Sequence, residues 1–187
     1  MHDLKDPIVS DKSMRRDWLK LSGLVAASAA LSSPLAASES PPQKVQFLDD
    51  LAILNVALGL ELQAVAAYQA GAESKLLPNA VLDIAVSFQH DHKRHRDAII
   101  GLIKKYGGTP VGPQSSYDFG TIKTAEDILK LAFTLEQGAV DAYLANAYKL
   151  KSDVILDAAV PILVDEVRHT TTFKLALGMS VTERRKY

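Results

Sequence analysis

The chain of 187 residues contains no cysteine. This absence excludes disulfide bonds, thiolate metal ligands, thiol catalysis and cysteine-linked lipid anchors. An excess of charge of either sign is missing too, because 21 Lys and Arg residues stand against 22 Asp and Glu residues and give a formal net charge of -1. This balance provides no electrostatic reason to expect nucleic acid or an anionic membrane surface as a partner.

Aromatic residues are also scarce, at 6% of the chain, although hydrophobic residues make up 48% of it. This apolar content is enough for the core of one globular domain of ordinary size. Alanine and leucine supply much of it, and both have high helix propensity. The composition therefore favours an all-α fold.

The N-terminal stretch has the features of an export signal. Residues 13–20 read SMRRDWLK, and no charged residue follows between Leu21 and Ser38. A basic start, a moderately apolar run and small residues at its end are typical of a secretory signal peptide, and the paired arginines resemble a twin-arginine signal. We expect residues 1–38 to direct the protein to the periplasm, with the membrane as a partner only during export. The alternative is an uncleaved N-terminal anchor, which Pro34 within the run disfavours.

Four blocks of apolar residues with helical spacing follow a short linker at residues 39–43. We expect helices over residues 44–74, 79–106, 124–150 and from residue 152 or 153 to just before Gly178, and a C-terminal tail over residues 179–187. Thr124, and either Ser152 or Asp153, are residue types that cap helix N-termini. Residues 107–123 (GGTPVGPQSSYDFGTIK) are rich in Gly, Pro and Ser, which predicts a long irregular connection between the second and third helices.

The second half of this region repeats the first. Residues 53–68 (ILNVALGLELQAVAAY) and 128–143 (ILKLAFTLEQGAVDAY) are identical at nine of sixteen positions, and residues 82–95 and 156–169 are identical at seven of fourteen. The two helical hairpins are therefore copies of each other. The long connection is able to cross the whole bundle and make the second and third helices parallel.

Polar side chains lie on the apolar stripes of all four expected helices. Glu61 and Glu136 occupy the same position in the two copies, and helical spacing places six metal-competent side chains towards the interior: Glu61, His92, His95, Glu136, Glu166 and His169. Buried carboxylates without a cation would be costly. One carboxylate from each of two helices and a carboxylate-x-x-His pair from the others is the pattern of bundle proteins that bind two iron or manganese ions.

Residues 165–169 read DEVRH, which matches the D-E-x-R-H motif of the ferritin-like di-iron carboxylate superfamily, and the resemblance covers the whole region 44–178. It implies an all-α, ferritin-like four-helix bundle with two iron or manganese ions that react with oxygen or peroxide. It also implies metal ligation by Glu61, Glu136, Glu166, His95 and His169, hydrogen bonds that Asp91 and Asp165 accept from the imidazole of the partner motif, and pairing of Arg94 and Arg168 with nearby acids. From their positions, Tyr68 and Tyr143 are expected to be core aromatics with hydroxyls bonded near the site.

His92 departs from this pattern. The first copy of the motif reads D-H-x-R-H, so an imidazole stands where the family has a glutamate. His92 is therefore either a metal ligand or a packing or hydrogen-bonding residue. A non-catalytic bundle that buffers metal, or that acts through protein contacts with a degenerate site, is the alternative to a redox enzyme, and assembly into a homo-oligomer stays open.

Overall fold

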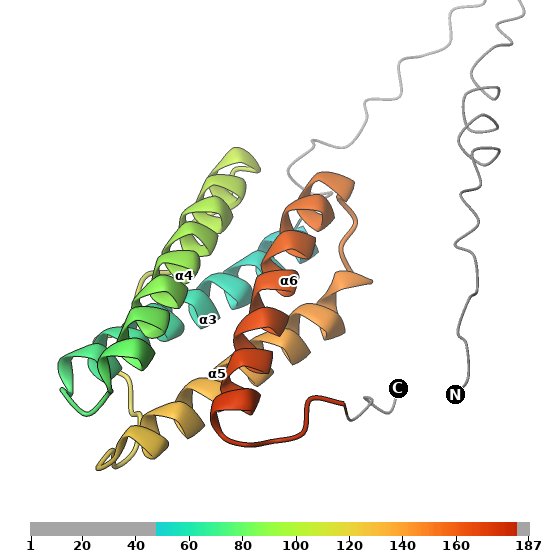
Figure 1. Ribbon diagram of the computed structural model, residues 1–187. Helices are drawn as coiled ribbons and strands as arrows, with labels where there is room; N and C mark the ends of the chain where they lie inside the picture. Colours follow the sequence, from blue (N-terminus) through green and yellow to red (C-terminus); the bar gives the residue numbers. More distant parts are fainter. Residues whose placement is uncertain (1–47, 183–187) are drawn as a thin grey trace, which may run out of the picture. The chain divides into compact units, whose positions relative to one another are not determined.

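The computed structural model describes residues 48–182, which form four α-helices and, within that range, no strand. These helices are α3 (Leu48–Glu73), α4 (Asn79–Lys105), α5 (Ala125–Ala147) and α6 (Asp153–Ala176) (Figure 1). The all-α, four-helix prediction is thereby confirmed. The expected signal peptide, the linker and the first residues of the first expected helix lie outside the described residues, as do the last residues of the tail.

Local side-chain chemistry sets the starts of the last two helices. Thr124 and Asp127 form a capping box, in which the Thr124 hydroxyl accepts from the Asp127 amide at 3.1 Å and the Asp127 carboxylate accepts from the Thr124 amide at 2.9 Å. The Ser152 hydroxyl accepts from the Ile155 amide at the start of α6. Thr124 therefore caps α5 as expected, and Ser152, one of the two candidates, caps α6.

The helices form two hairpins that pack face to face. α3 packs on α4 and α5, while α6 packs on α5 and α4, so α4 and α5 lie diagonally across the bundle. Two apolar clusters fill the interior. One is centred on Leu58, Ile99 and Ile162, and the other on Phe88 and Phe173.

The connection between α4 and α5 runs along α3. Near its start, the Asn55 side chain donates to the Thr109 carbonyl at 3.2 Å and accepts from the Val111 amide at 2.8 Å. Further on, Tyr117 and Phe119 border a cavity together with Gly71, near the C-terminal end of α3. The connection therefore returns the chain to the end of the bundle where α4 began, which makes α4 and α5 parallel (Figure 1).

Candidate metal centre

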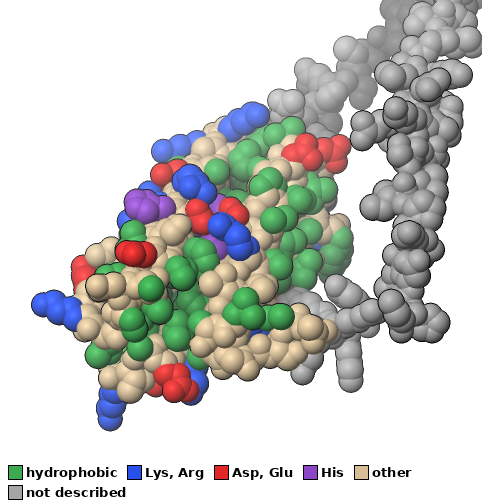
Figure 2. Space-filling view, in the orientation of Figure 1, with side chains coloured by type: hydrophobic (Ala, Val, Ile, Leu, Met, Phe, Trp, Pro, Cys, Tyr) green, Lys and Arg blue, Asp and Glu red, His purple; other side chains and the backbone are tan. Residues whose placement is uncertain are grey.

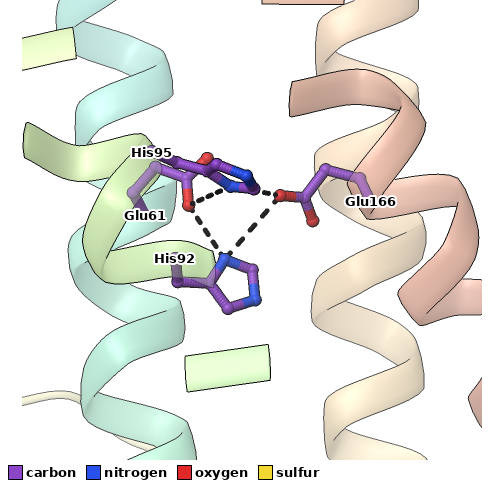
Figure 3. Close-up of side chains that lie close together, drawn as sticks. All are labelled: Glu61, His92, His95 and Glu166. Atoms are coloured by element: carbon purple, nitrogen blue, oxygen red, sulfur yellow. Dashed lines mark hydrogen bonds and ion pairs between the residues drawn. The ribbon is translucent and has the colours of Figure 1, made fainter. Parts of the chain in front are cut away.

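The six side chains predicted to face inward meet in the middle of the bundle. His95 is 6% exposed and the other five are at most 2% exposed. They make two overlapping groups whose ligand atoms lie within 4.8 Å of one another, and His92 and Glu166 belong to both groups. The first group is Glu61, His92, His95 and Glu166 (Figure 3), and the second is His92, Glu136, Glu166 and His169.

The position of the site follows from the helical repeat. Glu61 lies one helical turn from the buried residues Leu58 and Ala64, so all three share one face of α3. The same spacing places Glu166 one turn after the buried residue Ile162 on α6. Because Leu58 and Ile162 belong to one apolar cluster and Ala64 to the other, the polar layer lies between the two clusters.

His92 lies between two carboxylates. Its Nδ1 is 2.8 Å from Oε2 of Glu61, and its Nε2 is 3.0 Å from Oε1 of Glu136. Burial acts to lower the pKa of His92, but the hydrogen bonds to Glu136 and Glu61 outweigh it and raise the pKa well above its ordinary value. The imidazole therefore carries a positive charge at neutral pH and can donate to both carboxylates.

The three glutamates differ in charge state. Burial acts to raise the pKa of Glu61 and of Glu136, but the neighbouring histidines outweigh it and hold both pKa values below normal. Glu166 behaves in the opposite way, because burial and the negative charges of Glu136 and Glu61 raise its pKa to about 9. Glu61 and Glu136 are therefore ionised at neutral pH, whereas Glu166 holds a proton.

Some polar atoms in the cluster have no hydrogen-bond partner. They are Nδ1 of His95 and both carboxylate oxygens of Glu166, all of them buried. Nδ1 of His95 lies 3.2 Å from Oε1 of Glu166 without hydrogen-bond geometry. A buried polar atom without a partner costs about 1–3 kcal/mol, and a metal cation would satisfy all three atoms at once. These residues therefore fit a metal ion.

Two aspartates orient the imidazoles of the opposite motif. Oδ2 of Asp91 lies 3.1 Å from Nε2 of His169, and Oδ2 of Asp165 lies 3.2 Å from Nε2 of His95. If each imidazole carries its proton on Nε2, its Nδ1 is left as the atom that faces the carboxylates of the cluster. Such carboxylate–histidine pairs fix the tautomer and the orientation of metal-binding imidazoles.

Arginines cover these pairs on the α4–α6 side of the bundle. Arg168 donates to Asp91 at 2.6 Å and to Asp165 at 2.9 Å, and Arg94 donates to Asp91 at 2.6 Å. Burial acts to raise the pKa of Asp91, but His169 and Arg168 outweigh it and lower the pKa. Acidic and basic side chains gather at the centre of the face that α4 and α6 present in Figure 2.

Two tyrosines bond crosswise to the ionised glutamates. The Tyr68 hydroxyl on α3 donates to Glu136 on α5, and the Tyr143 hydroxyl on α5 donates to Glu61 on α3 at 3.0 Å. Burial and the nearby carboxylates raise the pKa of both hydroxyls well above normal. The hydroxyls therefore remain protonated and act as donors near the site, as expected from their sequence positions.

A narrow cleft between α3 and α5 also reaches the site, and the sequence analysis did not predict it. Its lining comprises Leu60, Glu61, Gln63, Ala64, His92, Leu135, Glu136 and Ala139. The internal repeat contained a sign of it, because the same small and apolar residues flank the two glutamates. Leu60 and Ala64 flank Glu61, and Leu135 and Ala139 flank Glu136.

Comparison with known proteins assigns the family. Residues 49–179 match the family model described as a ferritin-like domain. The chain belongs to the ferritin-like domain family. Family membership and the buried cluster of three glutamates and three histidines together indicate a metal-binding ferritin-like protein. A comparison with curated proteins gives no match.

Solved structures share the fold of this ferritin-like chain at low sequence identity. A conserved hypothetical protein from Mycobacterium tuberculosis is 22% identical with a TM-score of 0.65, and the match covers 74% of this chain and 96% of that one. Ferritin-like, diiron-carboxylate proteins from Bacillus anthracis give 17% identity and a TM-score of 0.60 over 74% and 99% of the two chains. A DUF305 fragment from Deinococcus radiodurans is 19% identical with a TM-score of 0.58, and the match covers 74% of this chain and 97% of that one.

Proposed function

We propose that this ferritin-like protein binds two iron or manganese ions and uses them in a reaction with peroxide or dioxygen. The observation that carries the proposal is the buried set of three carboxylates and three imidazoles in which Glu166 and His95 have ligand atoms without partners. Oxygen and imidazole donors without thiolate suit iron and manganese. The structural neighbour from Bacillus anthracis, which is described as a diiron-carboxylate protein, also supports a site for two metal ions.

The residues of the cluster and its surroundings would bind the metal, orient the ligands and donate hydrogen bonds to them. Glu61, Glu136, Glu166, His95 and His169 would be ligands, while Asp91 and Asp165 would keep the imidazoles of His169 and His95 oriented. When bound, the two ions would supply the two electrons that, with two protons, reduce one peroxide to two waters. Tyr68 and Tyr143 would donate hydrogen bonds to the ligand carboxylates throughout.

Export to the periplasm belongs to the same proposal. The twin-arginine type signal within residues 1–38 is the observation that supports it. The twin-arginine route carries proteins that are already folded, so a metal site could be filled before the chain leaves the cytoplasm. Oxygen or peroxide would then be met in the periplasm.

A second candidate is a periplasmic bundle that buffers metal or acts through protein contacts, without redox chemistry. The observation that favours it is His92, whose two ring nitrogens pair Glu61 and Glu136 within the protein itself. A cationic imidazole at this place takes over part of the charge compensation that metal would provide. Such a site would bind metal more weakly than one with four carboxylates.

Anaerobic loading followed by peroxide separates these candidates. Protein is loaded with ferrous iron or Mn²⁺, the bound metal is quantified, and the ultraviolet-visible spectrum is followed after one equivalent of peroxide is added. The redox proposal predicts two ions per chain and a spectral change complete at one peroxide per two ions. Bound metal that does not react would support buffering instead. The double variant His95→Ala/His169→Ala should abolish the change, and His90→Ala, at an exposed position on α4, should preserve it.

A further inference from the structure

We propose that the cleft between α3 and α5 is the route by which a neutral molecule with two heavy atoms, such as peroxide, reaches the buried site. This inference rests on the proposed function, because it concerns access to the same cluster. The cleft contains Glu61, His92 and Glu136 in its wall, so a molecule inside it lies directly against three members of the cluster.

On the other sides, other side chains stand between the site and the surface. On the α4–α6 side, Arg168 binds Asp91 and Asp165 across the two helices. Towards one end of the bundle, Phe88 stacks on the His169 ring with centroids 3.9 Å apart and meets Phe173 edge to face. Towards the other end, Leu58, Ile99 and Ile162 pack beside the site, and an apolar cavity next to them has Tyr143 in its wall but none of the six cluster residues. The α3–α5 cleft therefore gives a more direct approach than that cavity, because Glu61, His92 and Glu136 form part of its wall.

The size and chemistry of the cleft select small neutral molecules. Its volume of about 20 Å³ is close to the space that a single water molecule requires. Beyond the site residues, Leu60, Ala64, Leu135 and Ala139 make its wall apolar, and transfer of an ion past such a wall is strongly unfavourable. Peroxide and dioxygen are uncharged and only one heavy atom larger than water, so they are the candidates that come nearest to both limits.

Among the residues of α3 that line the cleft, one differs in kind from its counterpart in α5. Leu60 and Ala64 of α3 correspond to Leu135 and Ala139 of α5, but Gln63 corresponds to Gly138. Gly138 is exposed next to Ala139 of the wall, and a Cβ added there would meet nothing within 4 Å, so a larger side chain has room beside the cleft. Gln63 is half-buried in the wall, and its amide has no hydrogen bond to any residue within 48–182. This amide is the positioning group that would bind the incoming molecule.

Blocking the cleft from either helix tests the route. Gly138→Leu would narrow the cleft from α5, and Gln63→Phe would narrow it from α3. The matched control is Gly101→Leu, because Gly101 is an exposed glycine within α4 whose added Cβ also meets nothing within 4 Å. Association of nitric oxide with the ferrous protein is followed by stopped flow, since nitric oxide is a neutral molecule with two heavy atoms. Metal content and melting temperature are measured for each variant.

We expect Gly138→Leu and Gln63→Phe to slow nitric oxide association by about tenfold or more, because a close-packed wall admits small molecules only when it moves. Metal content should stay at the wild-type value in both, and Gly101→Leu should bind nitric oxide at the wild-type rate. Wild-type rates in the two blocking variants, with metal bound, would overturn the route but leave the proposed function standing. Wild-type protein that takes up no metal would overturn the proposed function and this inference with it.

Discussion

His92 stands in the first copy of the repeat where Glu166 stands in the second, and its contacts show what the difference does. Its ring nitrogens lie 2.8 Å from Glu61 and 3.0 Å from Glu136, so one imidazolium pairs two buried carboxylates. A glutamate at this position would instead add a further negative charge to the cluster. The imidazole therefore lowers the negative charge of the cluster, and under the proposed function we expect the site to favour divalent over trivalent ions.

Removal of the imidazole should destabilise the metal-free protein. His92→Ala leaves Glu61 and Glu136 buried without their shared partner, and loss of one member of a buried ion pair costs about 3–5 kcal/mol. His90→Ala is the matched control, because His90 is exposed on the same helix and such surface changes stay within about 0.5 kcal/mol. Urea unfolding of both variants measures the difference. Equal stabilities would show that His92 does not pair the glutamates.

Metal binding should strengthen as pH rises. The pKa of Glu166 is raised to about 9 and that of His95 to about 10, so both groups hold protons at neutral pH. A metal ion must displace these protons, and affinity should therefore rise by about tenfold per pH unit for each proton released. Competition with a chelator of known pH dependence, between about pH 6 and pH 8, measures the slope. An affinity that is flat or falls over this range would contradict the assigned protonation states.

The sequence predicted which residues meet and the pairing of each aspartate with the imidazole of the opposite motif, but not the contacts of His92. The internal repeat was sufficient to select Glu61, Glu136 and the D-x-x-R-H residues, because matched polar positions on two apolar stripes are rarely accidental. The bridging contacts of His92 depend on distances between α3, α4 and α5, which periodicity along one helix does not contain. The ligand roles themselves stay predictions.

At the scale of helices, a buried acid ties two distant helix starts together. Asp50 is fully buried near the start of α3, and its carboxylate accepts from the backbone amides of Lys151 and Ser152 at 2.9 Å each, next to the start of α6. This contact was not predictable from the sequence, because an Asp near a helix start is already favoured there by its interaction with the helix dipole. Lys151 and Ser152 belong to the segment between α5 and α6. This segment is longer than expected, because α5 ends at Ala147 and not at residue 150.

Asp50→Ala should therefore destabilise the bundle far more than the same change at its neighbour. The substitution leaves two backbone amides without an acceptor. Each of these amides that stays buried lowers the free energy of unfolding by about 1–3 kcal/mol. Asp49 is the control, since its carboxylate is 71% exposed and forms a surface pair with Lys151, which is worth at most about 1 kcal/mol. Thermal and urea unfolding measure both variants. A loss in Asp49→Ala as large as in Asp50→Ala would contradict this role.

At the scale of the whole molecule, the fold was predictable because two signals agreed. The repeat of a helical hairpin and an irregular connection of 17 residues (107–123) together require two similar hairpins joined across the bundle. The structure adds the path of the connection, which Asn55 holds against α3. The cleft between α3 and α5 was not predictable, because it depends on how closely two helices from different hairpins approach each other.

Metal content with and without chelator tests the central claim, that the buried cluster binds metal, most directly. Protein purified from its native export route is analysed for iron and manganese, and its melting temperature is recorded before and after treatment with chelator. The account predicts two ions per chain, a lower melting temperature after their removal, and loss of both effects in His95→Ala/His169→Ala but not in His90→Ala. Protein without bound metal, whose stability is indifferent to chelator and to added iron or manganese, would contradict it.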